Sequence, residues 1–301
     1  MPVETRSTTG SSRQVVEDSA CRGDREPSVS SRLDGLLTRT RRRAHERRSI
    51  VWPLQVAVLI LLVAVWEIVV EAGVMQELYV SKPSAIAAAF RDGVVSGALL
   101  TDLKVTLYET VVGFALATVT GIAVGLVLSQ LPLLNAVFRP FFTAFNNLPR
   151  LALAPLFVLW FGLGSASKIV LVVSLCFFIV MFNTYAGLQN ANRDHLLLAK
   201  TLGARRMTLF RKFVLPSAVP TIFAGLQLAL TYAFLSAVVG EMLSGSTGLG
   251  ASMQLALTSY RTADFFAALI LLVIVATTFS GIMRIIERKQ LHWKSYEMQG
   301  L

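Results

Sequence analysis

Long apolar stretches separated by short polar segments dominate the chain beyond its first 50 residues. A bilayer core about 30 Å thick is crossed by an α-helix of about 20 predominantly apolar residues. Windows of this kind predict six membrane-spanning helices, at Val51–Val70, Thr110–Leu128, Arg139–Phe161, Ile169–Tyr185, Ala218–Val239 and Phe265–Ile286. The predicted fold class is therefore all-α, a polytopic membrane protein with six transmembrane helices and both ends on the same side.

The composition of the 301-residue chain supports this prediction. Hydrophobic residues make up 54% of the chain and charged residues only 15%, whereas about a quarter of the residues in a soluble domain are charged. A soluble body of this size cannot bury so much apolar side chain. A soluble globular enzyme is thereby excluded, and two cysteines exclude a disulfide scaffold.

The basic residues predict the orientation of the spans, because cytoplasmic loops carry an excess of Lys and Arg. With the N-terminus inside, 22 of the 28 Lys and Arg fall in the cytoplasmic segments 1–49, 129–139, 188–217 and 284–301. Only four fall in the external segments 71–109, 162–167 and 240–264. Both termini are therefore predicted to be cytoplasmic. The net charge of +10 is explained by these segments, so no nucleic-acid partner is expected.

The chain is predicted to have four regions. Residues 1–48 are rich in Arg, Ser and Thr, which indicates a disordered basic cytoplasmic tail whose arginines lie next to the first span and contact anionic lipid. Residues 49–78 hold the first transmembrane helix and an external segment. A core with the other five helices and the cytoplasmic loop 188–217 occupies residues 79–286, and residues 287–301 form a second cytoplasmic tail.

Two spans carry small residues at helical spacing, which lets another helix backbone approach closely. The second span has Gly113, Ala117, Gly121 and Gly125, and the fifth has Gly225, Ala229, Ala233 and Ser236. Helix packing is the favoured interpretation of both stripes, and a stripe that faces a solute is the alternative.

The third span is unlike an ordinary membrane helix, because it contains polar residues and three prolines, Pro140, Pro149 and Pro155. Such residues are tolerated at membrane depth only against protein or a wet cavity. Either Arg150 pairs with a carbonyl group freed by a proline or snorkels to the surface, or it lines a solute pathway and attracts an anion. The candidate pathway residues are Asn146, Asn147, Arg150 and Glu241.

No catalytic group of residues is recognisable. His45, His195 and His292 all lie outside the spans, and no His or Cys pair has the spacing of metal ligands. The closest approach to a phosphate-binding loop, Gly162–Ile169, lacks the second glycine and the final Ser or Thr. The chain is therefore expected to be no enzyme, to hold no metal or cofactor and to hydrolyse no ATP.

The loop between the fourth and fifth spans contains a predicted docking element. Gly203 can end a first helix in a left-handed cap. The pattern from Arg205 to Lys212 then predicts about two turns of amphipathic helix, in which Met207, Phe210 and Phe213 share a face. Pro216 is expected to begin the helix of the fifth span. A short helix with exposed apolar side chains is suited to a partner's groove, and a helix on the membrane surface is the alternative.

The spacing of this loop resembles the signature of ABC-importer permeases. Ala199, Gly203, nine residues, and then Phe213-Val214-Leu215-Pro216 match it, while Leu197 and Leu198 stand where the signature has Glu and Ala. Further segments resemble the nitrate/sulfonate/taurine-type branch, namely Pro149–Leu156, Trp160–Gly164, Gly240-Glu241 and Gly248-Leu249-Gly250.

The resemblance implies a type I importer permease fold in a bacterial inner membrane. It implies a second permease copy in a homodimer, two ATPase subunits that bind the ATP, and an external solute-binding protein. The solute would be a nitrate, sulfonate or taurine-like anion, or a thiamin-precursor-like pyrimidine. The ATPase-coupling residues would be Ala199, Gly203, Ala204, Arg205, Met207, Phe210, Arg211, Leu215 and Pro216. The alternative function is a self-sufficient secondary transporter, although intramembrane carboxylates are scarce.

The predicted topology is tested by single cysteines and a membrane-impermeant thiol reagent. Cysteines at Ser84 and Ser246 are expected to react from the outside of intact cells, and a cysteine at Thr208 only after the membrane is opened, because the basic segments lie inside. Reaction at Thr208 from outside would contradict both the orientation and the coupling loop.

Overall fold

The computed structural model describes residues 51, 53–73, 79–190, 197, 199–245 and 247–290. The tail predicted at 1–48, most of that at 287–301 and the labelling position Ser246 lie outside these residues. The chain divides into two compact units, Met1–Val65 and Trp66–Leu301. In the first, the described residues from 53 onward belong to the start of the apolar helix Pro53–Glu71, and their side chains are exposed.

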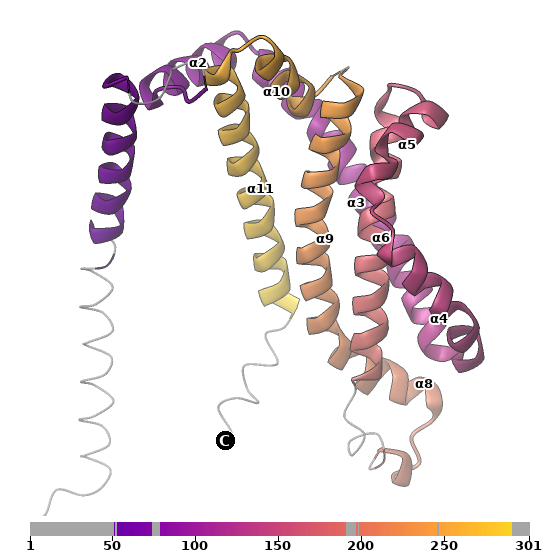
Figure 1. The fold of residues 1–301 in the computed structure, drawn as a ribbon. Helices are drawn as coiled ribbons and strands as arrows, with labels where there is room; N and C mark the ends of the chain where they lie inside the picture. Colours follow the sequence, from indigo (N-terminus) through magenta and orange to yellow (C-terminus); the bar gives the residue numbers. More distant parts are fainter. Residues whose placement is uncertain are drawn as a thin grey trace, which may run out of the picture. The chain divides into compact units, whose positions relative to one another are not determined.

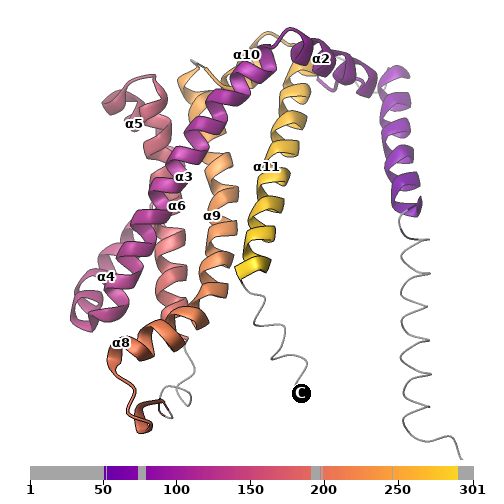
Figure 2. The ribbon, with the colours of Figure 1, turned by 180° about the vertical axis from the view of Figure 1, so that it is seen from behind.

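The second unit is built from helices (Figures 1 and 2). In chain order they are α2 (Pro83–Val95), α3 (Ala98–Gln130), α4 (Pro132–Asn147), the 3-10 turn η1 (Arg150–Leu153), α5 (Ala154–Phe161), α6 (Ser165–Gln189), α8 (Arg206–Leu209), the π-turn η2 (Phe210–Val214), α9 (Leu215–Ser244), α10 (Leu249–Thr258) and α11 (Thr262–Gln290).

The prediction of six spans is confirmed by length and composition. Among the described residues, five helices are long and apolar enough to cross a membrane, and there are six if the bent pair Pro132–Asn147 and Arg150–Phe161 is one span. The observed helices are longer than the apolar windows, because their backbone hydrogen bonding continues through the polar residues at the ends. Two helices were not predicted, α2 and α10. Both lie at the end of the bundle opposite α8 (Figure 1), here called the α10 end and the α8 end.

The third span is broken by 76° between its two halves. Leu148 is extended, and Pro149 cannot donate to the carbonyl oxygen of Phe145, which a helix would require. The other two prolines of the predicted span do not break it. Pro140 lies inside α4, and Pro155 stands in the first turn of α5, where the missing N–H costs nothing. The predicted irregularity is therefore confined to one point.

Close packing of α3 on α6 forms one half of the core. A Cβ atom on Gly113 would lie 2.6 Å from the side chain of Val172, and one on Gly121 would lie 2.9 Å from the carbonyl oxygen of Phe177. Neither distance is possible for a real side chain. The helix-packing interpretation of the stripe is thus confirmed, since only glycine lets the two backbones come so close.

The stripe on α9 packs against α6 from the other side. A Cβ atom on Gly225 would lie 2.4 Å from that of Asn183, and Ala229, Ala233 and Ser236 have no exposed surface. The alternative of a stripe that faces a solute is wrong in this structure, because no part of it is accessible. The helix α6 therefore stands between α3 and α9 and determines where both of them lie.

Replacement of Gly121 by alanine tests this packing. The new methyl group meets a backbone oxygen that cannot move aside, and overpacking of this kind costs about 1–3 kcal/mol. We expect a lower apparent Tm of the detergent-purified protein. The matched control is Gly281→Ala on α11, where a Cβ meets nothing within 4 Å and the change favours the helix. Equal Tm values for the two variants would contradict the packing.

Candidate functional site

The predicted docking loop ends its first helix at Gly203, as expected. Gly203 has a φ of +80°, and its N–H donates to the carbonyl oxygen of Lys200 at 3.0 Å. The N–H of Ala204 donates to the carbonyl oxygen of Ala199, also at 3.0 Å. This pair of bonds is the Schellman arrangement, in which a left-handed residue closes a helix. The buried Ala199 anchors the cap to the bundle.

The chain beyond the cap differs from the prediction. Arg205 is extended, and α8 then continues through the π-turn into α9 as a single helix, Arg206–Ser244, of 39 residues. Pro216 therefore does not restart a separate helix. It has no N–H to donate, and the turn just before it takes the wider π hydrogen bonding, in which the N–H of Leu215 reaches the carbonyl oxygen of Phe210. Figure 1 shows α8 turned away from the axis of α9.

The apolar surface of this segment is also arranged differently. Met207 is 66% exposed and Leu202 80% exposed, whereas Phe210 is half-buried and Leu209 is buried against the bundle. The face available to a partner therefore centres on Leu202 and Met207, with Phe213 at its edge. The other predicted coupling residues frame it: Arg205 and Arg211 are exposed, and Ala204, Leu215 and Pro216 are half-buried.

Arg150 closes the break in the third span. Its Nη1 donates to the carbonyl oxygen of Ser174 at 2.8 Å, and its Nη2 donates to Oδ1 of Asn146 at 2.7 Å. Longer bonds of 3.4 Å reach the carbonyl oxygen of Phe145, to which Pro149 cannot donate and which also accepts from the N–H of Leu148 at 3.4 Å. The guanidinium also lies 4.2 Å from the ring centre of Phe178. Arg150 therefore pairs with backbone carbonyl groups at the break, in line with the first of its two interpretations, and a role in the solute pathway stays a prediction.

Arg150 also lines a cavity of about 420 Å³ between the broken span, α6 and α9. Asn146 lines it too, and the remaining wall is mostly apolar, with Tyr232 of α9 on the far side. No ion pair joins Arg150 to a carboxylate within the described part of the chain. Arg150 therefore brings one positive charge to the cavity wall. Among the described residues, this charge is stabilised by carbonyl dipoles, the side chain of Asn146 and the ring of Phe178.

The other two candidate pathway residues are not in this cavity. Asn147 is exposed at the end of α4 and is absent from the cavity wall. Glu241 lies near the α10 end of α9 with no exposed surface at all. The structure thus brings together Asn146 and Arg150 and separates them from Asn147 and Glu241.

Glu241 instead caps α10. Its Oε1 accepts a hydrogen bond of 2.7 Å from the hydroxyl of Thr106 on α3, and its Oε2 accepts one of 2.7 Å from the N–H of Gly250. Thr106 in turn accepts from the N–H of Leu249 at 2.9 Å. A carboxylate at a helix N-terminus is favoured by the unpaired N–H groups and the helix dipole. The glycines are required, since a Cβ on Gly248 would lie 2.1 Å from Glu241 Oε1.

A second buried charge pair lies beside this cap. Lys168 Nζ of α6 is 3.3 Å from Glu109 Oε1 of α3, and neither side chain is exposed. The same ammonium group donates to the carbonyl oxygen of Thr247, in the loop before α10, at 3.4 Å. Both carboxylate oxygens of Glu109 are buried without a hydrogen-bond partner in the described residues, so the charge of Lys168 is what stabilises this carboxylate. The ion pair joins α3 to α6, and the bond to Thr247 joins α6 to the α9–α10 loop.

Sequence reasoning missed this polar cluster of Thr106, Glu109, Lys168 and Glu241. The contacts join residues up to 135 positions apart, so no local spacing predicts them. One signal was present: a charged residue stands at the same end of each of three predicted spans, before the second, before the fourth and after the fifth. Opposite charges at one membrane depth are expected to pair.

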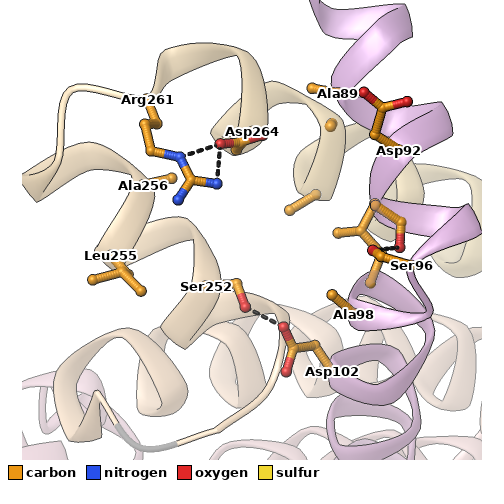
Figure 3. A pocket seen from close by; sticks show the side chains of 14 residues that line it. Ala89, Asp92, Ser96, Ala98, Asp102, Ser252, Leu255, Ala256, Arg261 and Asp264 are labelled. Carbon is orange, nitrogen blue, oxygen red and sulfur yellow. Dashed lines mark hydrogen bonds and ion pairs between the residues drawn. The ribbon is translucent and has the colours of Figure 1, made fainter.

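A further cavity of about 640 Å³ opens at the α10 end, between α2, α3, α10 and α11. Figure 3 shows the ion pair of Arg261 with Asp264 on one side and the hydrogen bond of Ser252 with Asp102 on the other. No group of three or more His, Cys, Asp or Glu side chains in the described residues is placed to hold a metal ion.

Comparisons with known proteins agree with this architecture. The model of the family described as binding-protein-dependent transport system inner membrane component matches residues 117–292. The chain is 30% identical to the putative aliphatic sulfonates transport permease protein SsuC of Bacillus subtilis, over 78% of this chain and 86% of that protein. It is 33% identical to the formylaminopyrimidine transport permease protein ThiX of Halalkalibacterium halodurans, over 78% and 93%.

A solved structure shows the same fold. The crystal structure of an amino acid ABC transporter with histidines matches with a TM-score of 0.54 at 19% identity, over 66% of this chain and 98% of that one. The chain is thus a multi-pass membrane protein with the type I importer permease fold, and a transport component rather than an enzyme. It belongs to the family of binding-protein-dependent transport system inner membrane components.

Proposed function

We propose that this chain is the permease of an ATP-driven importer and acts as a homodimer. Separate ATPase subunits bind at the α8 end, which faces the cytoplasm together with both termini. A solute-binding protein delivers the solute at the α10 end, outside the bacterial inner membrane. The bundle alternates between access from one side and from the other, and the chain itself holds no cofactor.

The exposed apolar face around Met207 carries this proposal. Large apolar side chains that are exposed next to charged ones mark a protein-binding surface. The Schellman cap at Gly203 fixes the direction in which the chain enters α8, so the face is held in place before a partner binds. Exposed Arg205 and Arg211 on either side keep the segment out of the hydrocarbon core, which favours a protein partner over a lipid one.

The cavity at Arg150 supports a small organic anion, and we propose an aliphatic sulfonate as the solute. The guanidinium is fixed by the backbone carbonyl of Ser174 and the side-chain oxygen of Asn146, and no carboxylate of the described residues pairs with it. A planar guanidinium presents paired donors that suit the oxygens of an anion. The apolar wall opposite, with Tyr232, suits the alkyl part of such a solute. The similarity to SsuC points the same way.

Met207→Asp tests the docking face. A charge placed in an apolar groove loses its hydration without gaining a partner, so we expect co-purification of the ATPase to weaken roughly tenfold or more. Gly203→Val should have a similar effect, because a β-branched residue resists the positive φ. The measurement is the amount of ATPase retained by the affinity-purified permease at increasing dilution.

The matched control is Val95→Asp. Val95 is 81% exposed at the end of α2 on the other side of the bundle, so the same new charge should leave the ATPase bound. Full retention of the ATPase by Met207→Asp would exclude this face as the docking site.

Arg150→Gln tests the solute site. We expect uptake of a labelled aliphatic sulfonate by proteoliposomes to fall about tenfold or more, since a neutral amide attracts an anion far less. Arg150→Lys should retain part of the uptake, because the charge remains while the planar donors are lost. Arg139→Gln is the control: Arg139 is exposed on α4 and lines no part of the cavity.

Two results would count against the proposal. Uptake at the wild-type rate by Arg150→Gln removes the arginine from the pathway, and uptake of a pyrimidine in place of the sulfonate changes the solute class. Uptake by vesicles without any ATPase subunit would instead support a self-sufficient secondary transporter.

A further inference from the structure

The helix α10 has no capping side chain of its own. Its N-cap position is Gly248, which offers no side chain, and the first N–H groups of a helix need outside acceptors. Thr106 of α3 accepts the N–H of Leu249, and Glu241 of α9 accepts the N–H of Gly250. The start of α10 is therefore held by two other helices.

The loop that joins α9 to α10 restrains α10 less than these hydrogen bonds do. The connecting loop contains Gly245 and Gly248, both at positive φ, +63° and +101°. Glycine restricts the backbone less than any other residue, so these hinges alone do not make α10 follow α9. The carboxylate of Glu241 bridges the loop, next to the apolar packing of Leu249 and Met253 of α10 against Val238 of α9.

Glu241 is also connected to the docking face. It lies near the last turn of the single helix Arg206–Ser244, whose first turn carries Met207. The part that forms α9, Leu215–Ser244, is about 45 Å long at 1.5 Å per residue. Ala229, Ala233 and Ala237 are buried in the core along it, so α9 connects the turn that follows α8 to the position of Glu241.

The far side of α10 faces the cavity at the α10 end. Ser252, Leu255 and Ala256 of α10 line it, together with residues of α2, α3 and α11. Ser252 donates to the carboxylate of Asp102 on α3, across the cavity from the Arg261–Asp264 pair (Figure 3). Any movement of α10 therefore changes the shape of this cavity.

The charges around Glu241 make the connection stiff. Its own carboxylate is balanced by the N-terminus of α10, and its neighbour Glu109 is balanced by Lys168. Lys168 also donates to the carbonyl oxygen of Thr247, next to the N-cap Gly248. Because these groups have no exposed surface, separating them would leave unpaired charges in a dry interior.

We propose that Glu241 is a positioning residue that fixes α10 to α9, so that a movement of α9 imposed at the docking face reshapes the cavity at the α10 end. The inference rests on the proposed function, because the movement originates where the ATPase binds. It assigns to Glu241 a role in transmission, and none in contact with the solute.

Two single-cysteine reporters in the assembled complex test this. One replaces Leu255, which is 64% exposed on α10, and the other replaces Thr208, which is exposed on α8 next to Met207. Both are placed in a chain in which Cys21 is changed to serine and the buried Cys176 to alanine. The measurement is the rate of reaction with a membrane-impermeant maleimide, without nucleotide and after trapping with ATP and vanadate, in opened membranes.

Glu241→Gln places an NH₂ group where an oxygen now accepts, so one of its two hydrogen bonds is lost. In the chain with the reporter alone, we expect trapping to change the reaction rate of Leu255→Cys, and this change is the response. Glu241→Gln should reduce the response about tenfold or more, as for a lost charged hydrogen bond. Thr106→Val should reduce the response in the same way, whereas Thr106→Ser, which keeps the hydroxyl, should retain it. The Thr208→Cys reporter should stay protected by the ATPase throughout.

The matched control is Ser244→Ala. Its hydroxyl is buried on the same turn of α9 but bonds to the backbone oxygen of Glu241 within its own helix, so the response should remain. If Glu241→Gln does not assemble, Thr106→Val decides. A full response in these variants with Thr208→Cys protected overturns the inference alone. Reaction of Thr208→Cys regardless of the ATPase overturns the docking proposal, and the inference with it.

Discussion

The position of every other helix depends on how closely α3 and α9 approach α6. Glycines at the contact bring the backbone of α3 to within van der Waals distance of α6, and alanines do the same for α9. In a bilayer there is no hydrophobic force between helices, so such packing contributes much of the stability of the bundle. The fixed triplet brings the side chains of Thr106, Glu109, Lys168 and Glu241 into contact and defines one wall of the cavity at Arg150.

The break in the third span shows what a membrane requires of an irregular backbone. At the break, the carbonyl oxygen of Phe145 keeps only a long backbone bond, 3.4 Å from the N–H of Leu148, and lipid offers no further donor. Arg150 donates to that group and to the carbonyl oxygen of Ser174 in α6. One side chain therefore repairs the break and carries the charge that the solute proposal uses. The two roles are compatible because a guanidinium has five donors and no acceptor.

The features that could be predicted are those encoded locally. The six spans follow from apolar windows, the small-residue stripes from spacing, and the cap at Gly203 from one glycine after a short helix. The cluster around Glu241 could not be predicted, because its partners Thr106 and Gly250 come from different elements. The helix α10 was missed because half of its capping comes from α3. Pro216 was misread because its local effect, a helix break, is overridden by a π-turn that lets the helix continue.

The π-turn between α8 and α9 also determines the register of the docking face. Such a turn accommodates one residue more than an α-helical turn, and each residue rotates a helix face by about 100°. The buried stripe of α9 and the exposed Met207 are therefore out of step by that rotation. Deleting a single residue from Phe210–Val214 would restore the α-helical register and rotate α8 by about 100° relative to α9, which moves Met207 away from its exposed position and Leu209 away from its buried one. The length of this turn therefore sets which side chains of α8 reach a partner, independently of the identity of the residues in it.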